Sequence, residues 1–149
     1  MKFLKILAVL LMICFAGIQL IPTTLNQSNL VNKNDFLLVN NTPKKINKLL
    51  NKACYDCHSN NTVYPWYNNI QPFTWLINKH IVEGKKELNF SQWNELSQRR
   101  KVSKLRSIVK QIEQNKMPLN SYTILHKDSN LTSEDKKLII DYLIEMKKK

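Results

Sequence analysis

The sequence predicts an all-α protein, with four or five helices in its folded part and one apolar helix ahead of them. Two patterns support this fold class. From about residue 42 onward, apolar residues recur at the three- and four-residue spacing of a helix face. No segment longer than four residues has the strand-like alternation of apolar and polar side chains.

The first helix of the folded part is expected to begin at Thr42-Pro43, with Thr42 as the N-cap and proline at the first helical position. Its apolar face consists of Ile46, Leu49, Leu50, Ala53, Cys54 and Cys57. The two cysteines therefore continue an apolar stripe. A second helix is expected from Pro72 to about Glu83, ending at Gly84.

Three further segments complete the predicted bundle. Ser91 is placed to cap a short segment that contains Trp93 and Leu96. An amphipathic helix follows and ends before Met117-Pro118; its apolar face is Val102, Leu105, Ile108, Val109 and Ile112. The last helix begins with a capping box within residues 131–135. Its apolar face is Leu138, Ile139, Tyr142, Leu143 and Met146.

Residues 1–21 are typical of an export segment. Lys2 and Lys5 form a short basic start, and an apolar run then continues to Ile21 and stops at Pro22. The segment is expected either to stay as a membrane anchor or to be cleaved as a signal; lipidation of Cys14 is disfavoured because Ile13 precedes it. Either way, the rest of the chain is expected in the periplasm, either anchored to the inner membrane or free.

The exported part divides into a tether and one domain. Residues 22–41 are rich in Asn, Thr and Ser, and contain one apolar island, Phe36-Leu37-Leu38-Val39, which we expect to pack onto the domain. Residues 42–149 form the predicted domain. The formal net charge of the whole chain is +12. Export argues against a nucleic-acid partner, so this charge favours an acidic redox partner or an anionic membrane surface, or serves solubility alone.

Cys54-Tyr55-Asp56-Cys57-His58 has the Cys-x-x-Cys-His spacing of c-type haem attachment. Two thiols three residues apart can form thioethers with the two vinyl groups of one porphyrin, and the adjacent histidine can bind the iron. The sequence therefore predicts one covalently attached haem c, held by Cys54 and Cys57, with His58 as an iron ligand.

Other uses of a Cys-x-x-Cys pair fit this sequence less well. A thioredoxin-like redox pair is found in a βαβ arrangement, which the sequence lacks. A zinc site needs a second pair of ligands, whereas His80 and His126 stand singly. A disulfide across two intervening residues closes too small a loop to stabilise a domain much.

The second axial ligand has four candidates: Met117, Met146, His80 and His126. Met117 precedes Pro118, which disfavours helical backbone at Met117 and predicts a loop position from which the thioether can reach an iron. Met146 lies on the apolar face of the last helix and suits core packing, which is also the alternative for Met117. We expect Met117 to be the ligand, with the two histidines as alternatives.

Two side-chain groups have more than one interpretation. The aromatic group, which is expected in the core or in the wall of the haem pocket, is Tyr64, Trp66, Tyr67, Phe73 and Trp75. The basic cluster is Arg99, Arg100, Lys101, Lys104 and Arg106. We expect this cluster to be a solvated helix face, with contact to haem propionates or to an acidic partner as the alternative.

The stretch from Ala53 to Asn60, followed by Tyr64-Pro65-Trp66-Tyr67, resembles a bacterial haem-binding domain family of small cytochrome-c-like proteins of Bacteroidetes type. The similarity covers roughly residues 35–143 and includes Pro72-Phe73-Thr74-Trp75, Glu83-Gly84, residues 88–91, Met117-Pro118, Tyr122 and His126. One departure is Leu119, where family members often have a second proline.

This resemblance implies a cytochrome-c-like bundle around a single c-type haem and an N-terminal membrane segment. It favours Cys54, Cys57 and His58 as haem-binding residues and Met117 as the distal ligand. The function we expect is single-electron transfer by a membrane-tethered, periplasmic cytochrome that is not an enzyme. A small haem peroxidase is one alternative, and a haem-based sensor or binding module with a displaceable sixth ligand is the other.

Overall fold

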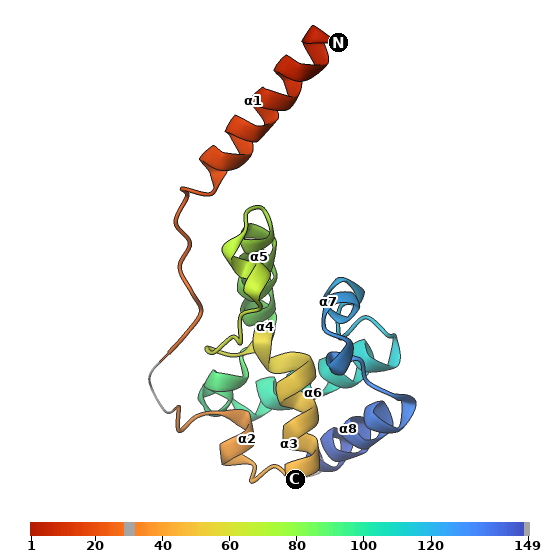
Figure 1. The fold of residues 1–149 in the computed structure, drawn as a ribbon. Helices are drawn as coiled ribbons and strands as arrows, with labels where there is room; N and C mark the ends of the chain where they lie inside the picture. The colour runs from red at the N-terminus through yellow and green to blue at the C-terminus, as the bar shows by residue number, and fades with distance from the viewer. Residues whose placement is uncertain (29–31, 148–149) are drawn as a thin grey trace.

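The structure is a computed structural model that describes residues 1–28 and 32–147, and all regular structure within these ranges is helical (Figure 1). The α-helices are α1 (Lys2–Ile18), α2 (Phe36–Val39), α3 (Lys44–Leu50), α4 (Asp56–His58), α5 (Phe73–Glu87), α6 (Gln98–Glu113), α7 (Asn120–Leu125) and α8 (Ser133–Met146). A π-helical turn, η1 (Asn51–Tyr55), joins α3 to α4, and 3-10 turns lie at η2 (Trp66–Asn69), η3 (Phe90–Glu95) and η4 (Lys127–Ser129). The all-α prediction is confirmed.

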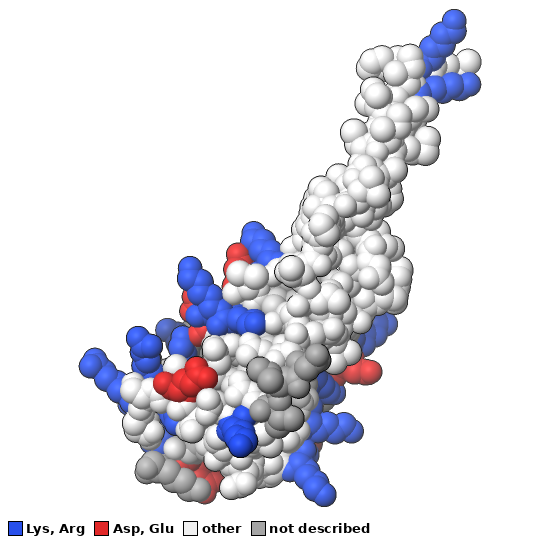
Figure 2. All heavy atoms as spheres, turned by 90° about the vertical axis from the view of Figure 1, so that its left-hand side faces the viewer, with Lys and Arg blue, Asp and Glu red and all other residues white. Residues whose placement is uncertain are grey.

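Helix α1 covers most of the predicted export segment and projects away from the other helices (Figure 1). It has no buried residue. Figure 2 shows that its surface carries charge only near the free end, where Lys2 and Lys5 lie. Within residues 1–28 and 32–147, none of the helices has the length and apolar character needed to cross a membrane.

The chain that follows α1 is bonded to the domain at two places. The side-chain amide of Gln19 accepts from the backbone N–H of Gln71 at 2.9 Å and donates to the Gln71 carbonyl at 3.3 Å. Asn26 is bonded to the segment 59–64 through its backbone and its side chain, and Lys85 donates to its side-chain oxygen at 2.6 Å. Part of the predicted tether, residues 29–31, lies outside the described residues.

The apolar core lies where α2, α3, α6 and α8 meet η1 and η3. Its fully buried large side chains include Phe36, Leu50, Phe90, Trp93 and Ile139. The Phe36 ring meets the rings of Phe90 and Trp93 edge to face, with centroids 5.3 and 4.9 Å apart. The island at residues 36–39 therefore packs onto the domain as predicted, as the short helix α2.

The predicted start of the first domain helix was wrong by one residue. Helix α3 begins at Lys44, and Pro43, rather than Thr42, is its N-cap. The Thr42 hydroxyl instead accepts a hydrogen bond from the Tyr142 phenol of α8 at 3.1 Å. By contrast, the predicted capping box is confirmed at the start of α8, where Thr132 and Asp135 bond each other's backbone and side chain.

Two other predicted boundaries also differ. Ser91 lies inside η3, and the side chain of Asn89 caps that turn by accepting from the Ser91 N–H at 3.1 Å. Helix α5 continues through Gly84 and ends at Glu87. The prediction took Gly84 for a helix end, because glycine is common there. Gly84 instead lies inside α5, at the place where this helix meets the backbone of Cys57.

Candidate functional site

The Cys-x-x-Cys-His segment lies at a change of helical geometry. Cys54 is in the π-helical turn η1, and Cys57 and His58 are in the short helix α4. A π-helical turn widens the backbone spiral by one residue and is frequently found at functional sites. Along this segment Ala53 and Tyr55 are buried in the core. Both cysteines and His58 are half-buried and lie at its edge.

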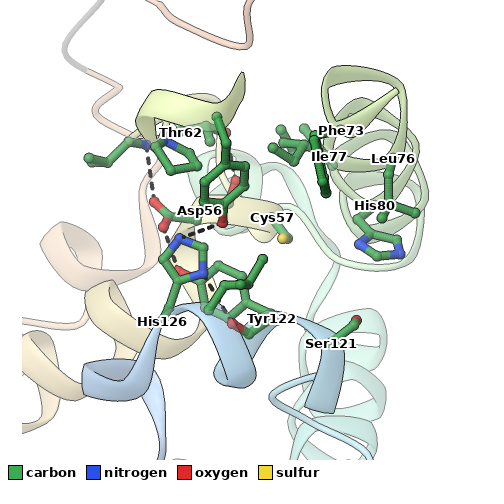
Figure 3. A pocket seen from close by; sticks show the side chains of 15 residues that line it. Asp56, Cys57, Thr62, Phe73, Leu76, Ile77, His80, Ser121, Tyr122 and His126 are labelled. Carbon is green, nitrogen blue, oxygen red and sulfur yellow. Dashed lines mark hydrogen bonds between the residues drawn. The ribbon is translucent and has the colours of Figure 1, made fainter. Parts of the chain in front are cut away.

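The two residues between the cysteines hold the segment in place. Tyr55 stacks on Phe90, with ring centroids 5.0 Å apart, and its phenol donates to Asp35 at 3.0 Å. The Asp56 carboxylate accepts from the Tyr122 phenol at 2.6 Å and from the Val63 N–H at 3.1 Å (Figure 3). The backbone that carries both thiols is thus fixed on two sides.

His58 has one ring nitrogen bound and one left free for a ligand. Its Nδ1 lies 2.9 Å from the carbonyl oxygen of Gly84 and 3.0 Å from that of Leu88. A carbonyl oxygen only accepts, so these contacts require the proton on Nδ1. The lone pair of a neutral imidazole is then on Nε2. This is the tautomer of an iron-ligating histidine whose other nitrogen bonds a backbone carbonyl.

Gly84 permits this contact because it has no side chain. A Cβ at this position would lie 2.7 Å from the Cys57 carbonyl oxygen and 3.3 Å from the Cys57 Cβ. Helix α5 can therefore lie directly against the backbone of the cysteine segment. The close approach brings the Gly84 and Leu88 carbonyls to His58.

Two adjoining cavities flank the cysteine segment. Their volumes are about 290 and about 210 Å³. Both cavities are lined by Ala53, Cys54, His58, Glu87, Met117 and Pro118. Cys57 lines the smaller one, and apolar side chains such as Phe90 and Leu131 line the larger one. The structure therefore brings Cys54, Cys57, His58 and Met117 to one hollow, although Met117 lies 59 positions after His58 in the sequence.

These residues fit a covalently held haem. The thiols and an imidazole whose Nε2 has no hydrogen-bond partner among the described residues line a largely apolar hollow, and the Met117 thioether lines the same hollow from a non-helical segment. Met117 lies beyond the end of α6, as its position before Pro118 predicted. Its backbone N–H donates to the Gln111 carbonyl at 3.3 Å, which holds the Met117 loop against α6.

The thiol pKa values bear on the alternative uses of the cysteines. Burial raises the pKa of the Cys54 thiol to about 12 and that of Cys57 to about 11. Thiolate-based redox chemistry and zinc binding both favour a lowered thiol pKa. Neither cysteine is in a disulfide. Among residues 1–28 and 32–147, no group of three His, Cys, Asp or Glu side chains could hold a metal ion.

The other candidate axial ligands have different surroundings. Met146 packs against the apolar core, as its place on the helix face suggested. Both ring nitrogens of His126 are within hydrogen-bond distance of a partner: Nε2 is 3.2 Å from the Tyr67 phenol, and Nδ1 is 3.1 Å from the Tyr122 carbonyl (Figure 3). His80 of α5 lines the smaller of the two cavities together with Met117.

The predicted aromatic group divides between two environments. Tyr67 and Phe73 line a third cavity of about 70 Å³, and Cys57 and His80 also line it (Figure 3). The Tyr64 phenol oxygen accepts a hydrogen bond from the Asn26 N–H at 2.7 Å. The two tryptophans of the group, Trp66 and Trp75, are exposed.

The basic cluster lies on α6 and is largely solvated. Arg99, Arg100 and Arg106 are exposed. Lys104 differs from them because it lines the larger cavity, and its ammonium donates to the Glu87 carbonyl. Lys and Arg side chains are spread over the body of the molecule rather than gathered in one patch on the face that Figure 2 shows.

Sequence reasoning missed three residues that shape this site. The sequence patterns predict a helix end at Gly84 and indicate no role for Asp56. Tyr122 enters only through the resemblance to the haem-binding family. Gly84 had a usable signal, because glycine inside a helical pattern costs stability and often marks a close approach of two backbones. The partnership of Asp56 with Tyr122 spans 66 residues and gives no local pattern.

Comparison with known proteins gives one positive result. A family model described as a haem-binding domain matches residues 13–145 of the chain, which is most of its length. No curated protein and no solved structure matches the chain.

Proposed function

We propose that this chain, which belongs to the haem-binding domain family, is a monohaem c-type cytochrome that transfers single electrons. The observation that carries the proposal is the pair of contacts at His58. Its Nδ1 is bound to the Gly84 and Leu88 carbonyls, so Nε2 is free for iron beside two thiols in one hollow. When bound, haem supplies an iron that gains and loses one electron.

The roles of the chain's own residues follow from their positions. Cys54 and Cys57 would hold the haem covalently, and His58 would bind its iron. Met117 would be the second iron ligand, since its thioether lines the same two cavities. Methionine opposite histidine raises the reduction potential and fills the coordination sphere, which suits electron transfer rather than bond-making chemistry.

The location and the partner are also part of the proposal. The basic start and apolar run of residues 1–21 support a periplasmic location for the domain, with this segment as a membrane anchor or removed as a signal. The net charge of +12 favours a redox partner with an acidic surface, which would be drawn to the cytochrome electrostatically. The rate of electron exchange should then fall as salt concentration rises.

Optical spectroscopy of the full chain, made with a c-type maturation system, tests the proposal. We expect c-type bands that stay with the protein under denaturing conditions, together with the weak near-infrared band of a methionine–ferric-iron bond. Met117→Ala should lose the near-infrared band, lower the reduction potential and bind added imidazole. A high-spin spectrum of the wild-type protein would instead favour a peroxidase or a sensor as its function. Absence of covalent haem would refute the proposal.

A further inference from the structure

Tyr122 joins the two sides of the candidate site. It lies in α7, five residues after Met117, and its phenol donates to the Asp56 carboxylate at 2.6 Å (Figure 3). Asp56 lies between the two cysteines of the attachment motif. One hydrogen bond therefore connects the segment that carries the thiols to the segment that carries the thioether.

The surroundings of Asp56 and Tyr122 favour this hydrogen bond, with Tyr122 as the donor and Asp56 as the acceptor. The second carboxylate oxygen of Asp56 accepts from the Val63 N–H at 3.1 Å, which fixes the carboxylate orientation. Burial and the hydrogen bond to Asp56 raise the pKa of Tyr122, so the phenol keeps its proton and remains a donor. A hydrogen bond from a hydroxyl to a carboxylate is among the stronger ones in proteins.

Helix α7 has little else to hold it. None of its residues is buried, and Ile124 and Leu125 are exposed. The apolar core therefore does not fix its position. The remaining ties are polar or aromatic. The Ser129 hydroxyl donates to the Tyr122 phenol oxygen at 3.5 Å. His126, at the end of α7, stacks on Tyr122 with ring centroids 4.2 Å apart and has its Nε2 3.2 Å from the Tyr67 phenol.

The Met117 loop depends on α7 at its far end. At the near end, the N–H groups of Lys116 and Met117 both donate to the Gln111 carbonyl of α6, at 2.9 and 3.3 Å. At the far end, the Tyr122 N–H donates to the Leu119 carbonyl at 3.0 Å, so the position of α7 sets where the loop finishes.

We propose that Tyr122 is a positioning residue that holds the Met117 loop against the Cys-x-x-Cys-His segment through Asp56. This inference rests on the proposed function, because it takes Met117 as the distal ligand. Its consequence is that the strength of the methionine–iron bond is set partly by the Tyr122 phenol, through its hydrogen bond to Asp56.

The experiment compares wild-type and Tyr122→Phe holoprotein by imidazole titration of the ferric state. Imidazole displaces a methionine ligand, so its apparent affinity measures how firmly the loop holds Met117 in place. Loss of a hydrogen bond to a charged group should bring about tenfold tighter imidazole binding. The near-infrared band should disappear at a correspondingly lower imidazole concentration.

Tyr142→Phe is the matched control. The Tyr142 phenol also donates one hydrogen bond, to Thr42, but it lies on α8 against α3. This variant should lose similar stability in denaturant unfolding and keep the wild-type imidazole affinity. Asp56→Ala should reproduce the effect of Tyr122→Phe, and the double variant should add little to either, as expected for partners in one interaction.

The outcomes separate this inference from the proposed function. If wild type shows the methionine band and Tyr122→Phe binds imidazole as weakly as wild type, the positioning role is refuted and the ligand assignment stands. An equal gain in imidazole affinity in Tyr142→Phe would also refute it, since the effect would then be one of general stability. If wild type lacks the methionine band, the ligand assignment itself fails and the inference fails with it.

Discussion

The Nδ1 atom of His58 lies 2.9 Å from the carbonyl oxygen of Gly84, and this contact makes α5 the element that orients the candidate iron ligand. The contact depends on the closeness of two backbones. Gly84 lies against Cys57, where any larger residue would meet the Cys57 carbonyl oxygen. The hydrogen-bond partner of the ligand and the contact to the attachment motif thus come from the same position in the chain.

Gly84→Ala should destabilise the protein. The added Cβ would lie 2.7 Å from a backbone oxygen, and overpacking of this kind costs about 1–3 kcal/mol. The higher helix propensity of alanine offsets roughly 1 kcal/mol of that cost. We therefore expect a net loss of up to about 2 kcal/mol, measured by denaturant unfolding of the holoprotein, with an altered spectrum if His58 moves.

Gly17→Ala is the control for this prediction. Gly17 is also helical, but apart from its chain neighbours and its own helix backbone, no atom of the described residues lies within 4 Å of a Cβ built there. The helix-propensity gain is the same and the overpacking is absent, so this variant should unfold at the same or a slightly higher denaturant concentration than wild type. Equal stability of the Gly84 and Gly17 variants would show that α5 and the cysteine segment do not approach as closely as described.

Phe36→Ala should show that the island before the domain belongs to the core. Phe36 is completely buried and meets two other aromatic rings, and the removal of a buried phenylalanine side chain costs about 3–5 kcal/mol. Leu38 lies in the same short helix but is 57% exposed. Leu38→Ala should therefore change the free energy of unfolding by no more than about 0.5 kcal/mol.

His80→Ala should leave the methionine–iron band of the ferric protein in place. His80 shares the smaller cavity with Met117, so it is the histidine best placed to compete for the sixth position. Near-infrared absorption of the variant checks the assignment against that of Met117→Ala. Retention of the band in Met117→Ala and its loss in His80→Ala would be the reverse of what we expect.

The capping box of α8 should make part of the stability dependent on pH. Hydrogen bonds from the Thr132 hydroxyl and backbone N–H lower the pKa of Asp135 below its ordinary value of 3.8. A group whose pKa is lower in the folded chain stabilises the fold above its unfolded pKa, and this contribution is lost as pH falls through the folded value.

Asp135→Asn should therefore be less stable than wild type at neutral pH, and the difference should narrow as pH falls from about 5 to about 2. Denaturant unfolding of both proteins at stepped pH measures this. A difference that stays constant across the range would mean that the Asp135 charge contributes nothing to the cap.

Much of the architecture could be predicted from local sequence patterns. The helical periodicity, the capping box of Thr132 and the apolar island at residues 36–39 each depend on neighbouring residues, and each is found in the structure. The Cys-x-x-Cys-His spacing also lies within five residues. Pro118 gave the non-helical position of Met117, because a proline restricts the residue that precedes it.

The parts that could not be predicted depend on which elements meet. Periodicity shows that a face of α5 is covered but not that the cysteine segment covers it, so Gly84 was read by its usual role at helix ends. Likewise, Thr42 was expected to cap a helix, whereas its hydroxyl contacts Tyr142, 100 residues later. Tyr122 and Asp56 are also far apart in the sequence, so no local pattern indicates that they form a hydrogen bond.

The bonds of Asn26 have a mechanical consequence. Its side chain donates to the carbonyl of Ser59, the residue directly after His58, and Gln19 is fastened to Gln71 further back. The chain between Gln19 and Asn26 is therefore held to the domain at both ends. It does not act as a long flexible linker between α1 and the domain. A force on the N-terminal segment would act first on the Gln19–Gln71 hydrogen bonds and next on the bonds of Asn26, beside the candidate iron ligand.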